Sequence, residues 1–582
     1  MKIFFQLAWF FKQEKRAYII GVSLLLIVAF LQLIPPKIIG IIVDEIHQKT
    51  LSARILVKWL MFLLLTGILM YIFRYFWRKM IFGSAVKLAR DLRFKLYEHY
   101  TKMPPSFYQR YRVGDLMARA TNDIQAVQQT AGSGVLTLVD SLLTGGMVVV
   151  AMAATISWKL TLIALIPMPL IAILTNWYGN LLHRRFSLAQ AAFSTLNDKV
   201  QESVTGVRVI KSFGHEKENI DDFRNQSADV VGKNIAVAKI DSLYDPTISI
   251  IVAVSYLLSI GFGAKFVVSG ELTLGELVSF TSYLGLLVWP MLAFGWLFNI
   301  LERGRASYGR ILSLLSEKSD VQEKENALDI VPSGDIEYKV DSFAYPGEAN
   351  PVLRDIYVYI KRGETVGIVG KTGAGKTTLL KLLLREFDVE DGNILFGGRP
   401  IKDYKLKRLR EAIGYVPQDH VIFSATVKEN IAFAAPDASE EKIREAAKAA
   451  NIHDDIMGFP DGYETMAGER GVSLSGGQKQ RISIARALLP DPEVLILDDA
   501  LSAVDARTEE KILKVLREKR KNKTTIITSH RLSSLAHADQ ILVLEDGKIV
   551  EKGTHEALMK LGGIYKEMFL RQQLEEQVEQ GG

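Results

Sequence analysis

The chain has no cysteine among its 582 residues. This absence excludes a disulfide framework, a thiolate metal site and a cysteine nucleophile, so the redox compartment cannot be inferred from cysteine usage. The N-terminus also lacks a short apolar run that ends in small residues, which is the pattern of a cleavage site. We therefore expect that no signal peptide is removed.

The chain also lacks a strong excess of either charge. It carries 71 Lys and Arg against 65 Asp and Glu, a formal net charge of +6. A basic excess can indicate a nucleic-acid partner, but here the basic residues stand between long apolar segments, where they orient a membrane protein. We therefore predict that the chain has no nucleic-acid partner.

Apolar residues are abundant and are concentrated in the first half of the chain. They make up 48% of the sequence, which predicts a membrane protein with a soluble portion. A helix needs roughly 20 residues to cross a hydrocarbon core of ~30 Å. Six stretches are long and apolar enough, near residues 17–41, 56–82, 134–157, 159–182, 246–269 and 273–301.

Basic residues flank these six stretches unevenly. They precede the first stretch and fill the two long segments between the second and third and between the fourth and fifth. The turns Ser157-Trp158-Lys159 and Ser269-Gly270-Glu271 carry almost no positive charge. Cytosolic segments are enriched in Lys and Arg, so we place both termini and both long loops in the cytosol. Aromatic residues such as Phe4 and Trp9 make residues 1–16 an expected interfacial helix.

The two long loops are predicted to be helical. Apolar residues recur at helical spacing in both, so the spans are expected to continue into the cytosol before they turn. The turns near 112–115 and 215–218 would then meet another domain, or they are simply solvated loop ends. Pro35-Pro36 and Pro290 should kink or unwind the first and sixth spans.

A soluble domain follows the membrane half. Residues 304–333 are polar and mixed in charge, which indicates a linker after a membrane domain of 17–303. Apolar strands alternate with helical stretches over 334–571, the pattern of an α/β domain with a largely parallel sheet. The last residues, 572–582, are predicted to be a polar, frayed tail.

A glycine-rich run follows one predicted strand and opens a helix. Glycines at this spacing let backbone N–H groups wrap phosphates, the lysine adds a positive charge, and a hydroxyl is offered to Mg²⁺. The residues that fit G-x4-G-K-[ST], with the threonine after them, are Gly370, Lys371, Thr372, Gly373, Ala374, Gly375, Lys376, Thr377 and Thr378.

Two further segments belong to this phosphate chemistry. Asp498 ends the apolar strand 494–497 and would complete the Mg²⁺ shell through water. The run Leu474-Ser475-Gly476-Gly477-Gln478 opens another helix, and a serine and two glycines at a helix start make an anion site. The sequence therefore predicts an ATP and Mg²⁺ site.

Together, the phosphate loop and the run Leu474–Gln478 resemble the ABC (ATP-binding cassette) family, in which that run is the signature motif. The resemblance implies further roles: Tyr345 for stacking on adenine, Gln418 for sensing Mg²⁺ and the membrane domain, and His530 as the γ-phosphate switch. Ser502-Ala503-Val504-Asp505 matches the loop that links two ATP sites.

The membrane half resembles the type IV exporter fold of the same family. Phe107-Tyr108, Gly114-Asp115-Leu116 and Thr121-Asn122-Asp123 match its first coupling loop, and Gly206–Lys211 lies on the approach to the second. Gly468-Glu469-Arg470-Gly471 matches a loop typical of exporters. The implied architecture is an all-α, six-helix transmembrane domain followed by an α/β nucleotide-binding domain, in a bacterial plasma membrane.

Asp499 departs from the family pattern, which has a glutamate at this position to align the attacking water. In the family each ATP lies between the phosphate loop of one cassette and the signature of another, so the chain must pair. The resemblance is nearest to the degenerate-site subunit of bacterial heterodimeric multidrug exporters. We therefore expect a partner chain with a catalytic glutamate, whose site is completed by Ser475–Gln478. A homodimer with two slow sites is the alternative.

The substrate is expected to be a hydrophobic or cationic small molecule, or a lipid. Aromatic side chains in the sixth span and one carboxylate in the third could contact it. Packing, interfacial anchoring or a hydrogen bond to a neighbouring helix would explain the same residues. Lipid or peptide export and a nucleotide-gated regulatory subunit stay open as other functions. The candidate substrate residues are Asp140, Tyr283, Trp289, Phe294 and Trp296.

Overall fold

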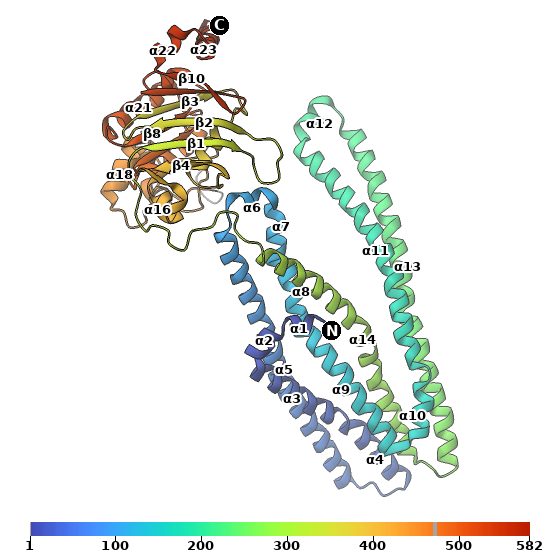
Figure 1. The fold of residues 1–582 in the computed structure, drawn as a ribbon. Coiled ribbons are helices and arrows are strands. Elements are labelled where there is room, and N and C mark those ends of the chain that lie inside the picture. Colours follow the sequence, from blue (N-terminus) through green and yellow to red (C-terminus); the bar gives the residue numbers. More distant parts are fainter. Residues whose placement is uncertain (1, 469–473, 582) are drawn as a thin grey trace. The chain divides into compact units, whose positions relative to one another are not determined.

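The computed structural model describes residues 2–468 and 474–581, with the backbone alone for residues 172, 176, 294, 295 and 575–581. The chain divides into a helical unit, residues 1–101 and 113–317, and an α/β unit, residues 102–112 and 318–582 (Figure 1). The predicted order of a membrane domain followed by an α/β domain is confirmed.

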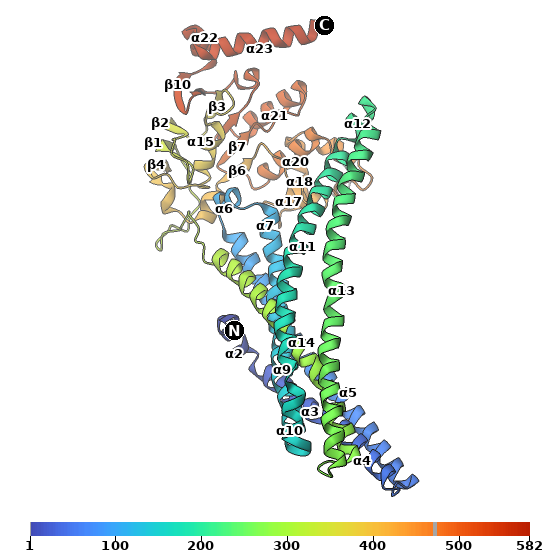
Figure 2. The same cartoon turned by 90° about the vertical axis from the view of Figure 1, so that its right-hand side faces the viewer.

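The helical unit is built from long helices, which Figures 1 and 2 show in two views. Three short π-helical stretches interrupt the third predicted span and the segment before it. They are η1 (Arg119–Asp123), η2 (Thr130–Gly134) and η3 (Ala153–Ser157). The α-helices are α1 (Lys2–Gln6), α2 (Ala8–Gln13), α3 (Lys15–Gln32), α4 (Ile34–His47), α5 (Ala53–Lys102), α7 (Val113–Ala118), α8 (Ile124–Gln129), α9 (Val135–Met152), α10 (Trp158–Leu165), α11 (Met168–Thr205), α12 (Val207–Phe213), α13 (Glu216–Val268) and α14 (Leu274–Leu315).

Within the described residues, five helical stretches are long and apolar enough to cross a membrane. They are Lys15–His47, Ala53–Lys102, Val113–Leu165, Glu216–Val268 and Leu274–Leu315. These stretches contain or overlap all six predicted spans, but only residues 159–165 of the fourth. The fourth predicted span, 159–182, is divided between α10 and α11, because the helix is interrupted at Ile166 and Pro167. Proline has no backbone N–H to donate, so helices tend to end near it.

The proline pair Pro35-Pro36 marks a helix break, as predicted. Helix α3 ends at Gln32 and α4 begins at Ile34, with prolines in its first turn. The Tyr283 hydroxyl donates a hydrogen bond of 2.7 Å to the carbonyl oxygen of Leu33, at the break. Pro290, in contrast, lies inside α14, which continues through it without unwinding.

Helices α4 and α14 approach each other through glycines. A Cβ atom at Gly275 would lie 2.0 Å from the carbonyl oxygen of Gly40, and one at Gly40 would lie 1.9 Å from Oγ of Ser279. The Asp44 carboxylate also accepts hydrogen bonds of 2.7 Å each from the Gly275 N–H and the Thr273 hydroxyl. The close approach therefore depends on the absence of side chains.

Gly275→Ala is expected to destabilise the protein by about 2 kcal/mol, because the added methyl group forces α4 and α14 apart. Thermal unfolding followed by tryptophan fluorescence measures the effect. Gly67→Ala on α5 is the matched control, since no atom lies within 4 Å of its added Cβ. Equal melting temperatures for the two variants would contradict the glycine contact.

The α/β unit contains two sheets. The six-stranded sheet has the order β10-β9-β3-β8-β7-β6 and is parallel except for β10, which confirms the predicted sheet type. A four-stranded antiparallel sheet has the order β2-β1-β4-β5. The strands are β1 (Ile336–Phe343), β2 (Leu353–Ile360), β3 (Thr365–Gly370), β4 (Asp391–Phe396), β5 (Arg399–Pro400), β6 (Ile413–Val416), β7 (Val494–Asp498), β8 (Thr524–Thr528), β9 (Gln540–Glu545) and β10 (Lys548–Gly553).

The same unit also contains α-helices. They are α6 (Pro105–Arg110), α15 (Lys376–Leu383), α16 (Leu406–Glu411), α17 (Val427–Ala432), α18 (Glu440–Ala449), α19 (His453–Met457), α20 (Gly476–Leu488), α21 (Ala506–Lys519), α22 (His555–Leu561) and α23 (Ile564–Gly581). Short 3₁₀ turns are η4 (Ile401–Asp403), η5 (Gly462–Glu464) and η6 (Leu532–Leu535). The tail predicted to be frayed from residue 572 is therefore helical to residue 581.

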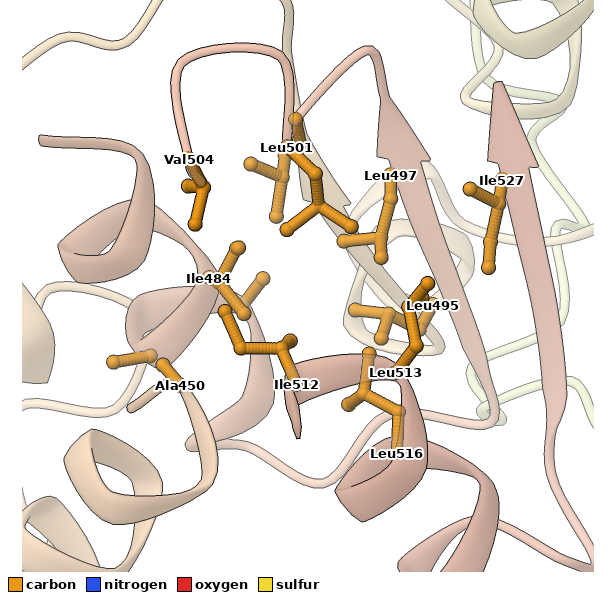
Figure 3. Close-up of a cluster of buried hydrophobic side chains, with 14 of the residues drawn as sticks. Ala450, Ile484, Leu495, Leu497, Leu501, Val504, Ile512, Leu513, Leu516 and Ile527 are labelled. Atoms are coloured by element: carbon orange, nitrogen blue, oxygen red, sulfur yellow. The ribbon is translucent and has the colours of Figure 1, made fainter. Parts of the chain in front are cut away.

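The central strands β7 and β8 are buried along their whole length, and β7 is apolar up to its last residue, Asp498. Alternate residues of β7 face opposite sides: Leu495 and Leu497 pack toward α20 and α21, whereas Val494 and Ile496 belong to a second cluster. Figure 3 shows the first cluster with Ile484 and Ile512. This packing fixes the strand whose last residue is Asp498.

The segment 102–112 packs with the α/β unit. The Ser106 hydroxyl donates a hydrogen bond of 2.9 Å to the Asp320 carboxylate, and Arg110 lies 3.4 Å from the same group. This segment directly precedes the turn near 112–115 that was expected to meet another domain. Contact of either turn, near 112–115 or near 215–218, with another domain stays a prediction.

Candidate nucleotide site

A pocket of about 290 Å³ lies at the carboxyl edge of the parallel sheet. It brings together much of the predicted phosphate loop, both predicted carboxylates, Gln418 and His530. Its lining residues are Val352, Thr372, Gly373, Gly375, Lys376, Thr377, Thr378, Gln418, Asp498, Asp499, Thr528, Ser529 and His530.

The phosphate loop has backbone geometry that requires glycine. Gly370, Gly373 and Gly375 have φ of 154°, 85° and 99°, and a Cβ atom at Gly370 would lie 2.3 Å from the carbonyl oxygen of Leu544. Helix α15 begins at Lys376, so its free N–H groups open toward the loop.

The Lys376 ammonium folds back over this loop. It donates hydrogen bonds of 2.8 Å to the Gly370 carbonyl and 3.0 Å to the Lys371 carbonyl. Burial lowers the pKa of Lys376, and the nearby charges of Asp498 and Asp499 oppose this shift. Desolvation disfavours the charged ammonium, so a phosphate group would be a better partner than the two carbonyls.

Thr377 and Asp498 fit a magnesium ion. The Thr377 hydroxyl lies 3.2 Å from Oδ1 of Asp498, so two hard oxygen ligands face one point. In the described part of the chain no cluster of three or more His, Asp or Glu could hold a metal by itself. Mg²⁺ binds through one or two protein oxygens together with phosphate oxygens and water. Thr377 and Asp498 therefore fit an Mg²⁺ ion that is bound together with the phosphates of ATP.

Thr528 is a site residue that the sequence analysis missed. Its buried hydroxyl donates a hydrogen bond of 2.8 Å to Oδ1 of Asp498 and accepts one of 2.9 Å from the Asp499 N–H. Asp498 and Thr528 are register partners at the ends of two parallel strands. Strand pairing was the signal that could have identified it.

Asp499 follows the strand in a left-handed conformation, with φ of 50°. Aspartate adopts this conformation more readily than most residues. The Ser502 hydroxyl donates a hydrogen bond of 3.0 Å to the Asp499 carbonyl, which links the turn to the segment Ser502–Asp505. The half-buried carboxylate lines the pocket, where a γ-phosphate would be attacked.

The half-buried His420 lies near this carboxylate, and its ring nitrogens are buried without a hydrogen bond. Neither of its ring nitrogens has a partner within the described residues. Burial lowers the pKa of His420; the charges of Asp419 and Asp499 oppose the shift, and Arg486 adds to it. Burial therefore favours the neutral form of this imidazole in the folded protein.

Acid should destabilise the protein through His420. The unfolded chain binds this proton more readily than the folded one as pH falls below the ordinary value of about 6.5, so stability decreases there. His420→Gln is expected to reduce the drop in melting temperature between pH 7.5 and pH 5.5. His537→Gln, at an exposed position, is the control and should leave the drop unchanged. An identical drop for wild type and His420→Gln would contradict the prediction.

Tyr345 lies against the start of α15 and not in the pocket lining. Its hydroxyl is 2.8 Å from the Thr378 hydroxyl, and its ring packs edge-on against Phe343 and Phe387, with centroid distances of 5.4 and 5.1 Å. Its role in stacking on adenine stays a prediction. Ala374 is buried, and Lys371 is exposed and pairs with Glu545 at 3.6 Å.

The predicted anion site at 475–478 is a well-formed helix start. The Ser475 hydroxyl accepts a hydrogen bond of 3.2 Å from the Gln478 N–H, and the Gln478 side chain accepts one of 3.0 Å from the Ser475 N–H. These two bonds form a capping box. Gly476 and Gly477 begin α20, and none of these four residues lines the pocket. The structure thus places the two predicted phosphate sites apart.

Gln480 is a second residue that the sequence analysis missed. Its buried amide donates to the Ser502 hydroxyl at 3.1 Å and accepts from the Ala503 N–H at 2.9 Å. It thereby ties the segment 502–505 to helix α20. Of the predicted loop Gly468–Gly471, residues 469–471 lie outside the described residues.

The candidate substrate residues lie in different environments. Asp140 accepts a hydrogen bond of 2.7 Å from Thr144 on its own helix, and Tyr283 is buried against Leu33. Trp289 and Trp296 are 56% and 46% exposed, with ring centroids 5.5 Å apart. The side chain of Phe294 lies outside the described part. Contact with a substrate stays a prediction for all five.

Two family models match the chain: "ABC transporter transmembrane region" over residues 18–291 and "ABC transporter" over residues 353–502. A curated relative, "Probable multidrug resistance ABC transporter ATP-binding/permease protein YheI" of Bacillus subtilis, is 49% identical over 98% of this chain and 97% of its own length. "Multidrug resistance-like ATP-binding protein MdlA" of Escherichia coli is 47% identical over 99% and 97%. A solved structure, "Structure of a bacterial Atm1-family ABC exporter with ATP bound", has a TM-score of 0.79 and 26% identity, covering 96% of this chain and 99% of that one.

Proposed function

Because the chain belongs to the ABC transporter family, with its membrane region and its nucleotide-binding domain in one polypeptide, we propose that it is one half of an ATP-driven exporter. The exporter moves hydrophobic or cationic drugs out of the cytosol or the inner leaflet. Both termini and the nucleotide site face the cytosol, in agreement with the basic residues of the long loops.

The observation that carries this proposal is an incomplete pocket. The pocket contains the phosphate loop and Asp499 but none of Ser475–Gln478, although these residues form a second anion-binding helix start. An ATP site that needs both a phosphate loop and a signature helix start is therefore completed only by a second cassette. Two ATP molecules then close the cassettes, and a cavity between the membrane helices turns from the cytosol to the outside.

In the proposed pair this chain carries Asp499 where its partner carries glutamate, so the two ATP sites differ. An aspartate is one carbon–carbon bond of roughly 1.5 Å shorter than a glutamate, so its carboxylate stands back from the attacking water. Losing a well-placed general base costs about 10² to 10⁴ in rate. This chain's own site therefore retains ATP, while its Ser475–Gln478 completes an active site on a partner that carries glutamate.

The drug class rests on the relatives, whose names include multidrug resistance, and on the exposed aromatic rings of Trp289 and Trp296. Such rings stack on flat, lipophilic cations. Asp140 lies within a membrane helix and bonds only its own Thr144 in the described structure, so its second oxygen is open to a cationic ligand.

Uptake of a fluorescent lipophilic cation into inverted membrane vesicles tests the proposal. Vesicles that contain this chain and a glutamate-bearing half-transporter should accumulate the dye when ATP is added. Vesicles with this chain alone should accumulate little. Equal accumulation with and without the partner would contradict the asymmetric pair, and no accumulation in either would contradict drug export.

A further inference from the structure

The loop that carries His530 is held by a side chain from the end of the chain. Oε1 of Gln572, on α23, accepts a hydrogen bond of 2.8 Å from the Leu532 N–H. Nε2 of the same amide donates one of 3.0 Å to the His530 carbonyl. A glutamine offers both a donor and an acceptor, so one side chain fixes the backbone on both sides of Arg531.

Helix α23 is itself firmly anchored. The Glu551 carboxylate accepts hydrogen bonds from the Ile564 N–H at 2.6 Å and the Tyr565 N–H at 3.1 Å, which caps the start of the helix. The Tyr565 ring is fully buried, and its hydroxyl lies 2.8 Å from Nδ1 of His555. Gln572 lies about two helical turns after Tyr565 on the same helix, so the Gln572 side chain extends from a helix that is held in place.

The same loop is tied on its other side to the segment 502–505. The Arg531 guanidinium donates a hydrogen bond of 2.9 Å to the Val504 carbonyl and one of 2.8 Å to the buried Glu509 carboxylate. The His530 side chain, in contrast, is exposed at the pocket lining. Its position toward a bound nucleotide is therefore set by the backbone that Gln572 and Arg531 hold.

We propose that Gln572 is a positioning residue of the nucleotide site, which holds the His530 backbone so that the imidazole faces the γ-phosphate of ATP. The proposal rests on the proposed γ-phosphate role of His530. A loop released from Gln572 samples other positions, and only the molecules with His530 in place gain the γ-phosphate contact. Helix α23 is thus part of the ATP site and not only a cover of the core.

Equilibrium binding of MgATP and MgADP to the full-length chain in lipid nanodiscs tests the proposal. Gln572→Ala should weaken MgATP binding about tenfold, the effect of losing hydrogen bonds of ordinary strength. MgADP binding should not change, because ADP has no γ-phosphate. Gln573→Ala is the matched control, since this neighbouring residue on α23 is exposed. It should bind both nucleotides like the wild type.

A double-mutant cycle separates positioning from general stability. In a His530→Ala background, Gln572→Ala should cause no further loss of MgATP affinity, because the group that it positions is gone. Should Gln572→Ala fail to fold, Gln572→Glu keeps the acceptor for Leu532 and loses the donor to His530. That variant should show the same selective loss.

Three results would overturn the proposal: equal losses of MgATP and MgADP affinity, an unchanged MgATP affinity in Gln572→Ala, or an undiminished loss in the His530→Ala background. An unchanged affinity in His530→Ala itself would remove the proposed role of the histidine and the positioning with it. The measurements need neither turnover nor a partner, so a failed asymmetric pair would show separately, in the vesicle uptake.

Discussion

Replacing Asp499 by glutamate should raise the ATP turnover of the purified full-length chain by about 10²-fold. The substitution keeps the charge and moves the carboxylate roughly 1.5 Å toward the attacking water. The left-handed backbone at this position suits aspartate better than glutamate, so Asp499→Glu is expected to lower the stability of the protein slightly. The expected rate gain corresponds to about 2.7 kcal/mol of activation free energy.

Asp499→Asn is the control for this experiment. It has the same length as aspartate and no charge, so it should show no gain over the wild type. Phosphate release by the reconstituted chain measures all three proteins. Rapid turnover in the wild type with no rise in Asp499→Glu would contradict the degenerate site and favour a homodimer with two working sites.

The second large effect is expected at Lys376. Lys376→Met should weaken MgATP binding by about 100-fold, because hydrogen bonds between a charged donor and a phosphate are roughly twice as strong as neutral ones. The ammonium already lies over the loop, bonded to two backbone carbonyls, and burial lowers its pKa. Part of the desolvation of this half-buried ammonium has therefore occurred before nucleotide binds.

Lys371→Met is the matched control, because it removes the same charge from the same loop. Lys371 is exposed and pairs only loosely with Glu545, so its loss should change MgATP affinity little. Isothermal titration with MgATP compares the two variants. Similar affinities for both would show that net charge, and not the position of Lys376, governs binding.

Local patterns predicted the phosphate loop, the strand that ends at Asp498 and the order of the two domains. The glycine spacing determines the phosphate loop, and the apolar runs determine the buried strands. Both features therefore depend on residues that are close together in the sequence. The interruption of the fourth span at Ile166 and Pro167 was missed, although the proline was its signal. Hydropathy alone does not register a broken hydrogen-bond ladder.

Residues that act across the fold were beyond such patterns. Thr528 meets Asp498 over 30 positions, Gln480 meets Ser502 over 22, and Gln572 meets His530 over 42. Each is a common polar residue whose role depends on which strands and helices become neighbours. The polar composition after Arg571 suggested fraying, because polarity by itself does not reveal a hydrogen bond to a distant loop.

Tyr283 illustrates a pattern with two physical explanations. An aromatic residue in a membrane helix fits a ligand contact and a packing contact equally well. The structure buries Tyr283 and gives its hydroxyl the Leu33 carbonyl, at the break between α3 and α4. The position of that break, set by Pro35 and Pro36 on another helix, could not be joined to Tyr283 from sequence alone.

Identification of the nucleotide bound to the chain tests the central claim most directly. The purified full-length protein is incubated with Mg²⁺ and radiolabelled ATP, freed of unbound nucleotide on a desalting column and then analysed. The asymmetric account predicts that the retained label is unhydrolysed ATP. Retained ADP together with steady phosphate release from the chain alone would contradict it.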